Sequence, residues 1–317
     1  MLLLDYHNLL LKSILTERIL DGNNSTSLNQ VVSDFDNVTF HISTPDVKTK
    51  IIVSLKIRCF NDLVKYGARE ILKREYGNFE LNPPEPGYDY SLQIDVESLP
   101  EDLEKRQEIV NNVSLLKRNI VAAPFEQAFD KFDHMAKEAE QQGLDLYAPE
   151  ASKEEVMVIN YRDEESIYVK PAHDRVTVIF STVFKDETDQ IFGKVFLQEF
   201  VDARKRAIQN APQVLYSHKE PPLEIRDVPG IRTSENVGYI TFVLFPRHLA
   251  KSRQDNCISH IQIFRDYFHY HIKCSKAFMH SRMRYRVSEF LKVLNRAKPE
   301  VADRERKTAS GRRFKPT

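Results

Sequence analysis

The chain has 317 residues, of which 41% are hydrophobic and 29% are charged, and its formal net charge is zero. This composition is typical of a globular protein with enough apolar side chains for two cores, and it excludes a low-complexity chain. The zero net charge gives no reason to expect a polyanion as the partner of the whole molecule.

The charge is unevenly distributed along the chain. Residues 252–317 contain sixteen Lys or Arg and six Asp or Glu, a balance of +10, so residues 1–251 carry a balance of −10. A basic C-terminal quarter beside an acidic remainder predicts two surfaces with different partners.

The cysteines and the N-terminal run indicate the compartment. Three cysteines without a CxxC pair are typical of a reducing environment. The apolar run at the N-terminus contains Asp5 and His7 and has no basic leader, which makes it a poor signal peptide. No window of about eighteen residues is uninterruptedly apolar. We therefore expect a cytoplasmic protein without a membrane span.

The first half of the chain predicts two strands, a helix, a third strand and a long helical region. β-Branched residues and alternating patterns favour the strands, Gly77 would end the helix, and Pro124 would break the helical region. In that order the expected elements cover residues 36–43, 48–57, 59–77, 88–96 and 98–137.

The second half repeats this plan after a polar segment at residues 136–155 that contains Gly143 and Pro149. Two strands, a helix, two further strands and a final helix are expected. In that order they cover residues 155–170, 174–186, 191–209, 212–220, 236–245 and 252–298.

Strands grouped with flanking helices, without strict βαβ alternation, predict an α+β fold. We expect two similar domains, each an antiparallel sheet flanked by helices, with a long C-terminal helix. An old duplication would explain the similar order of elements, and so would coincidence. The expected divisions are a domain at 1–137, a linker at 138–155, a domain at 156–298 and a basic tail at 299–317.

Three histidines and a cysteine on the final helix raise the question of a metal site. His269 and His271 lie about 200° apart around a helix, and His269 and His280 are separated by roughly 16 Å along it. Only His271 and Cys274 could reach one ion, whereas zinc needs three or four protein ligands. We therefore predict histidines on a helix surface or interface and no metal.

The final helix is too long and too apolar for one domain to cover. About 45 residues span roughly 65 Å, whereas a domain of this size is roughly 36 Å across. A helix that is apolar on two sides must be covered on two sides, by its own sheet and by another chain, unless it kinks and folds back. One stripe holds Ile258, Ile261, Phe264, Phe268, Ile272, Met279, Met283, Phe290 and Leu294. The other holds Ile263, Tyr267, Tyr270, Cys274, Phe278 and Tyr285.

Basic residues gather at the far end of this helix. They form either a solvated face or a contact for an acidic partner, and Glu289 is the sole acid of the helix after Asp266. A nucleic-acid motif is absent, and a membrane-surface or calmodulin-target segment is a further alternative. The basic residues are Arg282, Arg284, Arg286, Lys292, Arg296 and Lys298.

The chain carries none of the common motifs of catalysis. Nine glycines form no GxG, GxGxxG or GxxxxGK loop, and GxSxG and EF-hand patterns are absent. The acidic runs at residues 162–165 and 185–189 could imitate paired catalytic carboxylates, but we expect solvated turns there. We predict no enzyme activity, no catalytic residue and no cofactor.

Several stretches of the sequence resemble one known family. They are DRVTVIFSTVFKD, GKVFLQEF, APQVLYSHKEPPLE, NVGYITFVLFPRH, FRDYFHYHIKCSKAFMHSRMR and FLKVLNRAKP, with looser agreement in DFDNVTFHIS, KTKIIVSLKI and LLKRN. Together they are similar to the actin-related protein 2/3 complex subunit 2 family over nearly the whole chain. Departures occur in DGNNSTS, in NPPEPG, at residues 136–155 and in the basic tail.

The resemblance implies a non-catalytic scaffold of two similar α/β domains with a long C-terminal helix. Such a chain pairs with subunit 4 to form the core of the complex and binds the side of a pre-existing actin filament during branched nucleation. The resemblance also implies a location in the cytoplasm, in the cortical actin cytoskeleton. ATP would be bound by the actin-related subunits of the complex and not by this chain.

The resemblance also implies two sets of site residues. Contacts to subunit 4 or to the sister domain are expected from Phe264, Tyr267, Phe268, Ile272, Phe278, Met279 and Met283. Contacts to the acidic filament surface are expected from Arg282, Arg284, Arg286, Lys292 and Arg296, with Arg204, Lys205 and Arg206 second.

Overall fold

The computed structural model describes residues 4–22, 26–142 and 155–297. The chain forms two units, Met1–His271 and a second that begins at Ile272, and each is described by itself. Most of the predicted linker (138–155) and all of the predicted tail (299–317) lie outside the described residues.

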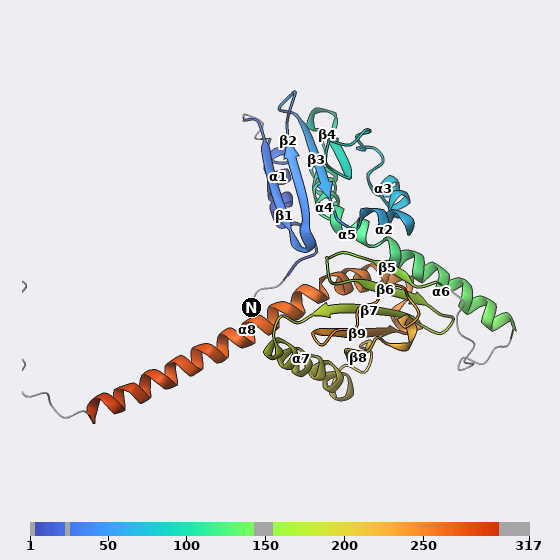
Figure 1. Ribbon diagram of the computed structural model, residues 1–317. Helices are drawn as coiled ribbons and strands as arrows, with labels where there is room; N and C mark the ends of the chain where they lie inside the picture. Colours follow the sequence, from blue (N-terminus) through green and yellow to red (C-terminus); the bar gives the residue numbers. More distant parts are fainter. Residues whose placement is uncertain (1–3, 23–25, 143–154, 298–317) are drawn as a thin grey trace, which may run out of the picture. The chain divides into compact units, whose positions relative to one another are not determined.

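The first sheet has four antiparallel strands in the order β1-β2-β3-β4 (Figure 1). Its strands are β1 (Asn29–Asp34), β2 (Val38–Ser43), β3 (Lys50–Lys56) and β4 (Tyr90–Asp95). Strand β1 was not predicted, because its residues alternate poorly and the strand leaves Asn29, Gln30 and Val31 exposed at the edge of the sheet. The other three strands lie inside the predicted ranges.

Helices accompany this sheet before and after β4. They are α1 (Leu9–Ile19), α2 (Phe60–Lys65), α3 (Ala68–Tyr76), α4 (Leu103–Ser114) and α5 (Leu116–Val121), with short 3₁₀ turns η1 (Phe35–Asn37) and η2 (Val96–Ser98). The single helix predicted at residues 59–77 is divided into α2 and α3. Gly67 separates them with a φ of +96°, a left-handed conformation that favours glycine.

The predicted helical region at 98–137 is three helices, of which the last is α6 (Ala123–Gln142). The breaks fall at Leu115 and Ala122. Pro124 therefore lies in the first turn of α6, where its missing N–H breaks no helical hydrogen bond, so it begins a helix. Helix α6 contacts β6 and β7 of the second sheet.

The second sheet has five antiparallel strands in the order β5-β6-β7-β9-β8 (Figure 1). Its strands are β5 (Met157–Ile159), β6 (Ile167–Pro171), β7 (Val176–Val183), β8 (Gln213–His218) and β9 (Val237–Leu244). The strand predicted at 155–170 is the hairpin of β5 and β6, whose turn holds residues 160–166. Between the strands lie α7 (Glu187–Arg206) and the turn η3 (Leu223–Ile225). The turn η4 (Pro246–His248) follows β9, and α8 (Lys251–Arg296) ends the described fold.

The centre of the second sheet is buried on both faces, which explains why β9 has eight consecutive buried residues. On one face Phe180 and Phe242 pack against Phe264 of α8. On the other, Ile179 and Tyr239 belong to a core cluster that Ile225 helps to form. Both sheets are antiparallel and flanked by helices, so the predicted α+β class with a long C-terminal helix is confirmed.

Across the described residues, no helix combines the length and the apolar character needed to cross a bilayer.

Candidate protein-binding surfaces of helix α8

The first half of α8 is held by an aromatic cluster. The ring centroid of Phe264 lies 4.6 Å from that of Phe242, and Phe268 contacts Phe196 at 5.7 Å and Phe184 at 6.1 Å. Phe268 is fully buried and Phe264 is 8% exposed. Phe264 and Phe268, two of the predicted contact residues, therefore pack in the chain's own core. Ile272, from the same predicted set, is also buried.

A glycine lets α7 come close to this cluster. A Cβ atom at Gly193 would lie 2.8 Å from the ring of Phe268 and 3.0 Å from that of Phe184. The first distance is shorter than real Cβ contacts and the second is tighter than most of them, so a larger residue would force the rings or α7 to shift. The approach of α7 fixes how the first half of α8 lies on the second sheet.

An apolar groove of about 740 Å³ runs beside the first half of α8. Helix α7 contributes Phe196, β9 contributes Phe242, and α8 contributes Ile261, Ile263 and Tyr267. The predicted contact residue Tyr267 is half-buried here. Its hydroxyl accepts a hydrogen bond from the Leu4 N–H at 2.8 Å and lies 3.1 Å from the Leu4 carbonyl oxygen, to which it donates.

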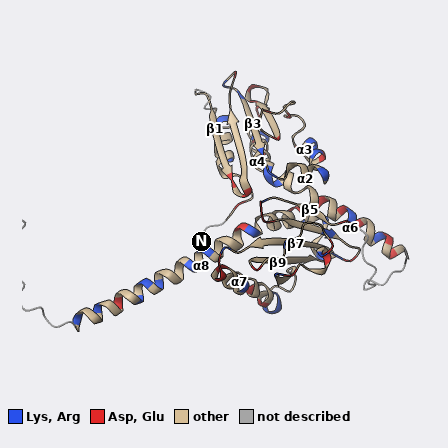
Figure 2. Cartoon of the chain, in the orientation of Figure 1, with Lys and Arg blue, Asp and Glu red and all other residues tan. Residues whose placement is uncertain are grey.

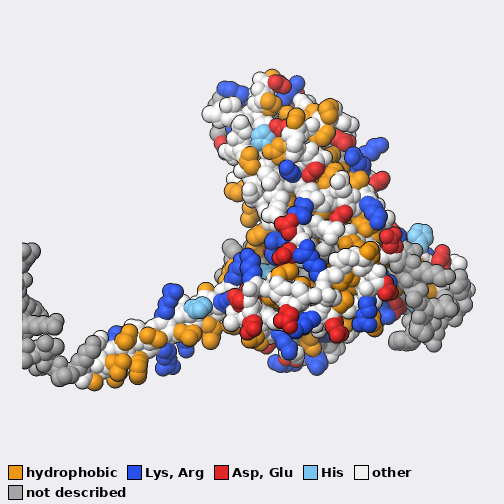
Figure 3. Space-filling model, in the orientation of Figure 1, with side chains coloured by type: hydrophobic (Ala, Val, Ile, Leu, Met, Phe, Trp, Pro, Cys, Tyr) orange, Lys and Arg blue, Asp and Glu red, His pale blue; other side chains and the backbone are white. Residues whose placement is uncertain are grey.

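The second half of α8 is exposed. From Lys273 to Ala297 each side chain is exposed except those of Lys276 and Glu289, which are half-buried. The predicted contact residues Phe278, Met279 and Met283 are 63%, 48% and 60% exposed. Figure 3 shows the apolar side chains gathered along this stretch. The remaining exposed large apolar residues are Tyr285, Val287, Phe290, Leu291, Val293 and Leu294.

Lys and Arg residues occur along this half of the helix as well (Figure 2). Arg284, Arg286 and Arg296 are exposed and have no acidic partner among the described residues. Lys292 pairs with Glu289 at 2.7 Å, and the guanidinium of Arg282 lies over the ring of Phe278 at 5.8 Å. Most of the charge predicted here for filament contact is thus available to a partner.

The second basic set lies at the end of α7, in the unit Met1–His271. Lys205 and Arg206 are exposed, Arg204 is half-buried, and Arg206 pairs with Asp202 at 3.4 Å. Burial, the largest cause, lowers the pKa of His248, and the neighbouring cations Arg247, Arg204 and Arg253 lower it further, while its hydrogen bond to Asn210 acts the other way. The two basic sets belong to different units of the chain.

The three histidines of the predicted cluster have separate surroundings. Nε2 of His269 lies 3.0 Å from the Thr182 hydroxyl, His271 stacks on Phe196 at 5.0 Å, and His280 is exposed. Among the described residues, no three His, Cys, Asp or Glu side chains are placed to hold a metal ion.

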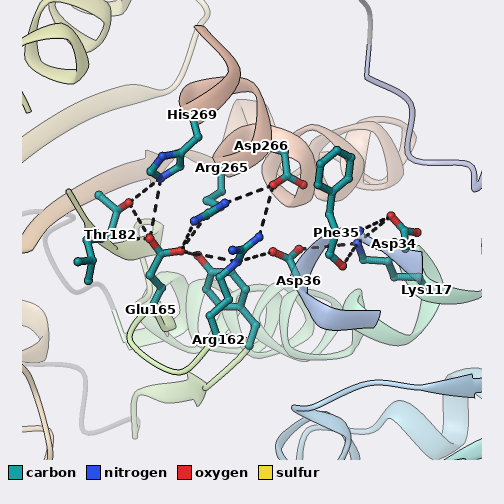
Figure 4. Close-up of polar contacts among 12 residues, drawn as sticks. Asp34, Phe35, Asp36, Lys117, Arg162, Glu165, Thr182, Arg265, Asp266 and His269 are labelled. Carbon is teal, nitrogen blue, oxygen red and sulfur yellow. Dashed lines mark hydrogen bonds and ion pairs between the residues drawn. The ribbon is translucent and has the colours of Figure 1, made fainter. Parts of the chain in front are cut away.

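A charge cluster that the sequence did not predict joins α8 to both sheets (Figure 4). Its centre is Glu165, which is 5% exposed although a solvated turn was predicted for residues 162–165. Arg265 of α8 donates to its Oε2 from Nε at 2.7 Å, and Val183 N–H and the Thr182 hydroxyl donate to Oε1. The prediction was wrong for Glu165 because these bonds satisfy a buried carboxylate.

The remaining members of the charge cluster come from the first sheet, α5 and the turn between β5 and β6. Arg162 donates to Asp36 at 2.8 Å, and Nζ of Lys117 lies 3.7 Å from the same carboxylate. Asp36 has a φ of +65°, which an L-residue adopts at some cost, and Asp and Asn tolerate it best. Separately, Arg118 of α5 donates to Ser259 and Asp255 of α8 at 3.0 and 3.1 Å.

An α+β chain whose final helix presents exposed apolar and basic side chains has the features of an interaction protein. Comparison with known proteins names the family. The family described as Arp2/3 complex, 34 kD subunit p34-Arc matches residues 53–301. The chain is 54% identical over 317 residues to actin-related protein 2/3 complex subunit 2 of Schizosaccharomyces pombe, and 41% identical over 316 residues to that of Dictyostelium discoideum. Each alignment covers 99% of both chains. The chain therefore belongs to the actin-related protein 2/3 complex subunit 2 family, as the sequence resemblance predicted.

Proposed function

We propose that this chain is a non-catalytic scaffold subunit of an actin-related protein 2/3 complex. It pairs with subunit 4 to form the core of the complex and binds the side of a pre-existing actin filament during branched nucleation. It acts in the cytoplasm, in cortical actin structures. The observation that carries the proposal is the second half of α8, which presents a series of large apolar side chains, interspersed with cations, to solvent.

Exposed apolar residues at this density need a partner. Within the described residues the series runs from Phe278 to Leu294, and single exposed apolar residues elsewhere on the chain are spread over several elements. Contiguous apolar surface of this kind marks a protein contact and favours aggregation when it is left open. The names of the relatives, which identify a subunit of a complex, support a partner chain as its cover.

The groove beside the first half of α8 supports a second contact with subunit 4. It is apolar, and Ile263 and Tyr267 of α8 line it together with Phe196 of α7. An apolar helix or loop of subunit 4 fits such a surface. Tyr267, Phe278, Met279 and Met283 therefore remain the proposed contact residues, whereas Phe264 and Phe268 serve the core and Ile272 is buried.

Co-expression with subunit 4 tests the pairing. We expect the double variant Phe278→Ser/Met283→Ser to lose most co-purification, because both side chains are exposed and would lie in the contact. The matched control is Leu223→Ser, which removes a side chain that is 75% exposed in the other unit. Equal recovery of subunit 4 with both variants would contradict the proposed contact.

Charge supports the second half of α8 as a filament contact. The filament surface is acidic, and Arg284, Lys292 and Arg296 are exposed cations that would steer and orient docking. Arg282 and Arg286 extend this set, and Arg204, Lys205 and Arg206 form the secondary one. Such a contact should weaken as the salt concentration rises.

Charge reversal tests the filament contact. We expect the triple variant Arg284→Glu/Lys292→Glu/Arg296→Glu to reduce co-sedimentation with filaments while leaving the complex assembled. The control, Lys56→Glu/Lys105→Glu/Lys185→Glu, makes the same change in net charge at exposed positions elsewhere. Unchanged co-sedimentation of the first triple variant across a salt series would remove this patch from the proposal.

A further inference from the structure

The charge cluster of Figure 4 contains more acid than base. Its cations are Lys117, Arg162 and Arg265, and when the His269 ring is neutral they face four carboxylates, so one negative charge is left over. The carboxylates belong to Asp34, Asp36, Glu165 and Asp266. Their side chains are between 6% and 18% exposed, so water screens the surplus charge poorly.

The geometry shows which carboxylate is least compensated. Arg265 directs Nε and Nη2 to Glu165 at 2.7 and 2.6 Å, and Arg162 directs Nε to Asp36 at 2.8 Å. Among the described residues, the cations closest to Asp266 make only longer approaches, 3.6 Å from Nη1 of Arg265 and 4.0 Å from Nη2 of Arg162. The side chain of Asp266 is 9% exposed, so an ionised carboxylate there is costly. Protonation of Asp266 would remove the surplus negative charge of the cluster.

We propose that this charge cluster is a proton-linked clasp, which takes up one proton on Asp266 as the pH falls from neutral and thereby tightens the contact of α8 with both sheets. The clasp joins the turn between β1 and β2, helix α5, the turn between β5 and β6, and the first half of α8. All of these elements lie in the unit Met1–His271, so the inference does not depend on the proposed function.

Each neighbouring element presents a charge to Asp266. The turn between β1 and β2 presents Asp36, α5 presents Lys117, the turn between β5 and β6 presents Arg162, and α8 presents Arg265. Burial is the largest cause that raises the pKa of Asp266, to about 6, and the charge of Asp36 acts in the same direction. The three cations lower the pKa of Asp266, but by less than burial and Asp36 raise it.

The sign of the effect follows from linkage. The pKa of Asp266 is higher in the folded chain, about 6, than its ordinary value of 3.8. Between these values the folded chain binds the extra proton, so this group's contribution to stability is complete at low pH and is lost as the pH rises through about 6. A difference of about two pKa units changes the folding equilibrium by up to about 100-fold.

The test compares unfolding of the full chain and of Asp266→Asn, in the assembly state in which they are purified, between about pH 4.5 and pH 8. The difference between the two proteins is the measured quantity, because His7 and His248, whose pKa values burial lowers, act in the opposite direction in both. We expect the variant to be more stable than the wild type above about pH 6.5, and the difference to shrink steadily toward pH 4.5, because the unfolded Asp266 takes up its own proton only near pH 3.8. The exposed Asp227→Asn is the matched control, for which no pH-dependent difference is expected.

Two further variants make the result decisive. Asp36→Asn removes the facing carboxylate, so the step should move to lower pH, and this variant replaces Asp266→Asn if the latter fails to fold. His269→Gln should leave the step in place. An Asp266→Asn variant that is less stable than the wild type at all pH values would overturn the proposal. So would a step that disappears in His269→Gln, or one that Asp36→Asn leaves unmoved.

Discussion

The two halves of α8 differ in what surrounds them although one helix contains both. In the first half the residues at helical spacing, such as Phe264 and Phe268, are buried against the second sheet. In the second half the same spacing continues through Met279 and Met283, and these side chains are exposed. The apolar pattern therefore predicts which residues need to be buried. Only the packing shows whether the chain's own residues bury them.

The largest effect is expected from Phe268→Ala in the buried half. This side chain is fully buried among the rings of Phe184, Phe196 and Phe264, and its loss leaves a cavity. We expect the free energy of unfolding to fall by about 3–5 kcal/mol. Urea unfolding followed by tyrosine fluorescence measures it, since the chain has 13 Tyr and no Trp.

The matched change in the exposed half is Phe278→Ala. Because this side chain is 63% exposed, its loss should change the free energy of unfolding by no more than about 0.5 kcal/mol. A large loss of stability with this variant would mean that the second half of α8 is covered by the chain itself, and the comparison would fail.

An effect smaller than that of Phe268→Ala is expected from Gly193→Ala, which acts on the buried half through α7. The added Cβ would lie 2.8 Å from the ring of Phe268, so α7 or the ring must shift. Overpacking of this kind costs about 1–3 kcal/mol. The gain in helix propensity of alanine over glycine offsets about 1 kcal/mol of it. A variant more stable than the wild type would show that the added methyl group meets no close contact and that α7 does not fix the position of α8.

The smallest effect is expected from acid at His248, just before α8 begins. Its Nδ1 accepts a hydrogen bond from the Phe245 N–H at 2.9 Å, and Nε2 donates to the Asn210 carbonyl at 2.7 Å. Protonation of Nδ1 breaks the first bond, and burial, with the nearby arginines, lowers the pKa of the ring. A lowered folded-state pKa means that the contribution of His248 is complete at neutral pH and is lost as the pH falls below about 6.5.

His248→Gln checks this prediction by thermal unfolding at pH values on either side of 6.5. The loss of stability on acidification should be smaller in the variant than in the wild type, while His7 continues to contribute in both. Identical losses in the two proteins would contradict the assignment to His248.

The sequence predicts the α+β class and the long helix because both follow from strong periodic patterns. It does not predict the break at Gly67, because one glycine within an amphipathic pattern is compatible with a continuous helix until its φ is known. It does not predict strand β1 either, because an exposed edge strand has a weak apolar pattern.

The sequence predicted some residues of the candidate surfaces and missed others, again because it does not show how the elements pack. Helical spacing finds Phe278 and Met283, which lie on one element, but it cannot distinguish them from the buried Phe268. The charge cluster was missed because Asp36, Glu165 and Asp266 are distant in sequence, and only the fold brings them together. An acidic run such as residues 162–165 gives no sign that one of its members is buried.

The assembly state of the chain tests the central claim most directly. Size-exclusion chromatography with light scattering is run on the chain expressed alone and on the chain co-expressed with subunit 4. We predict self-associated material for the chain alone and a defined heterodimer on co-expression, because a partner then covers the second half of α8. A monodisperse monomer that does not bind subunit 4 would contradict this account.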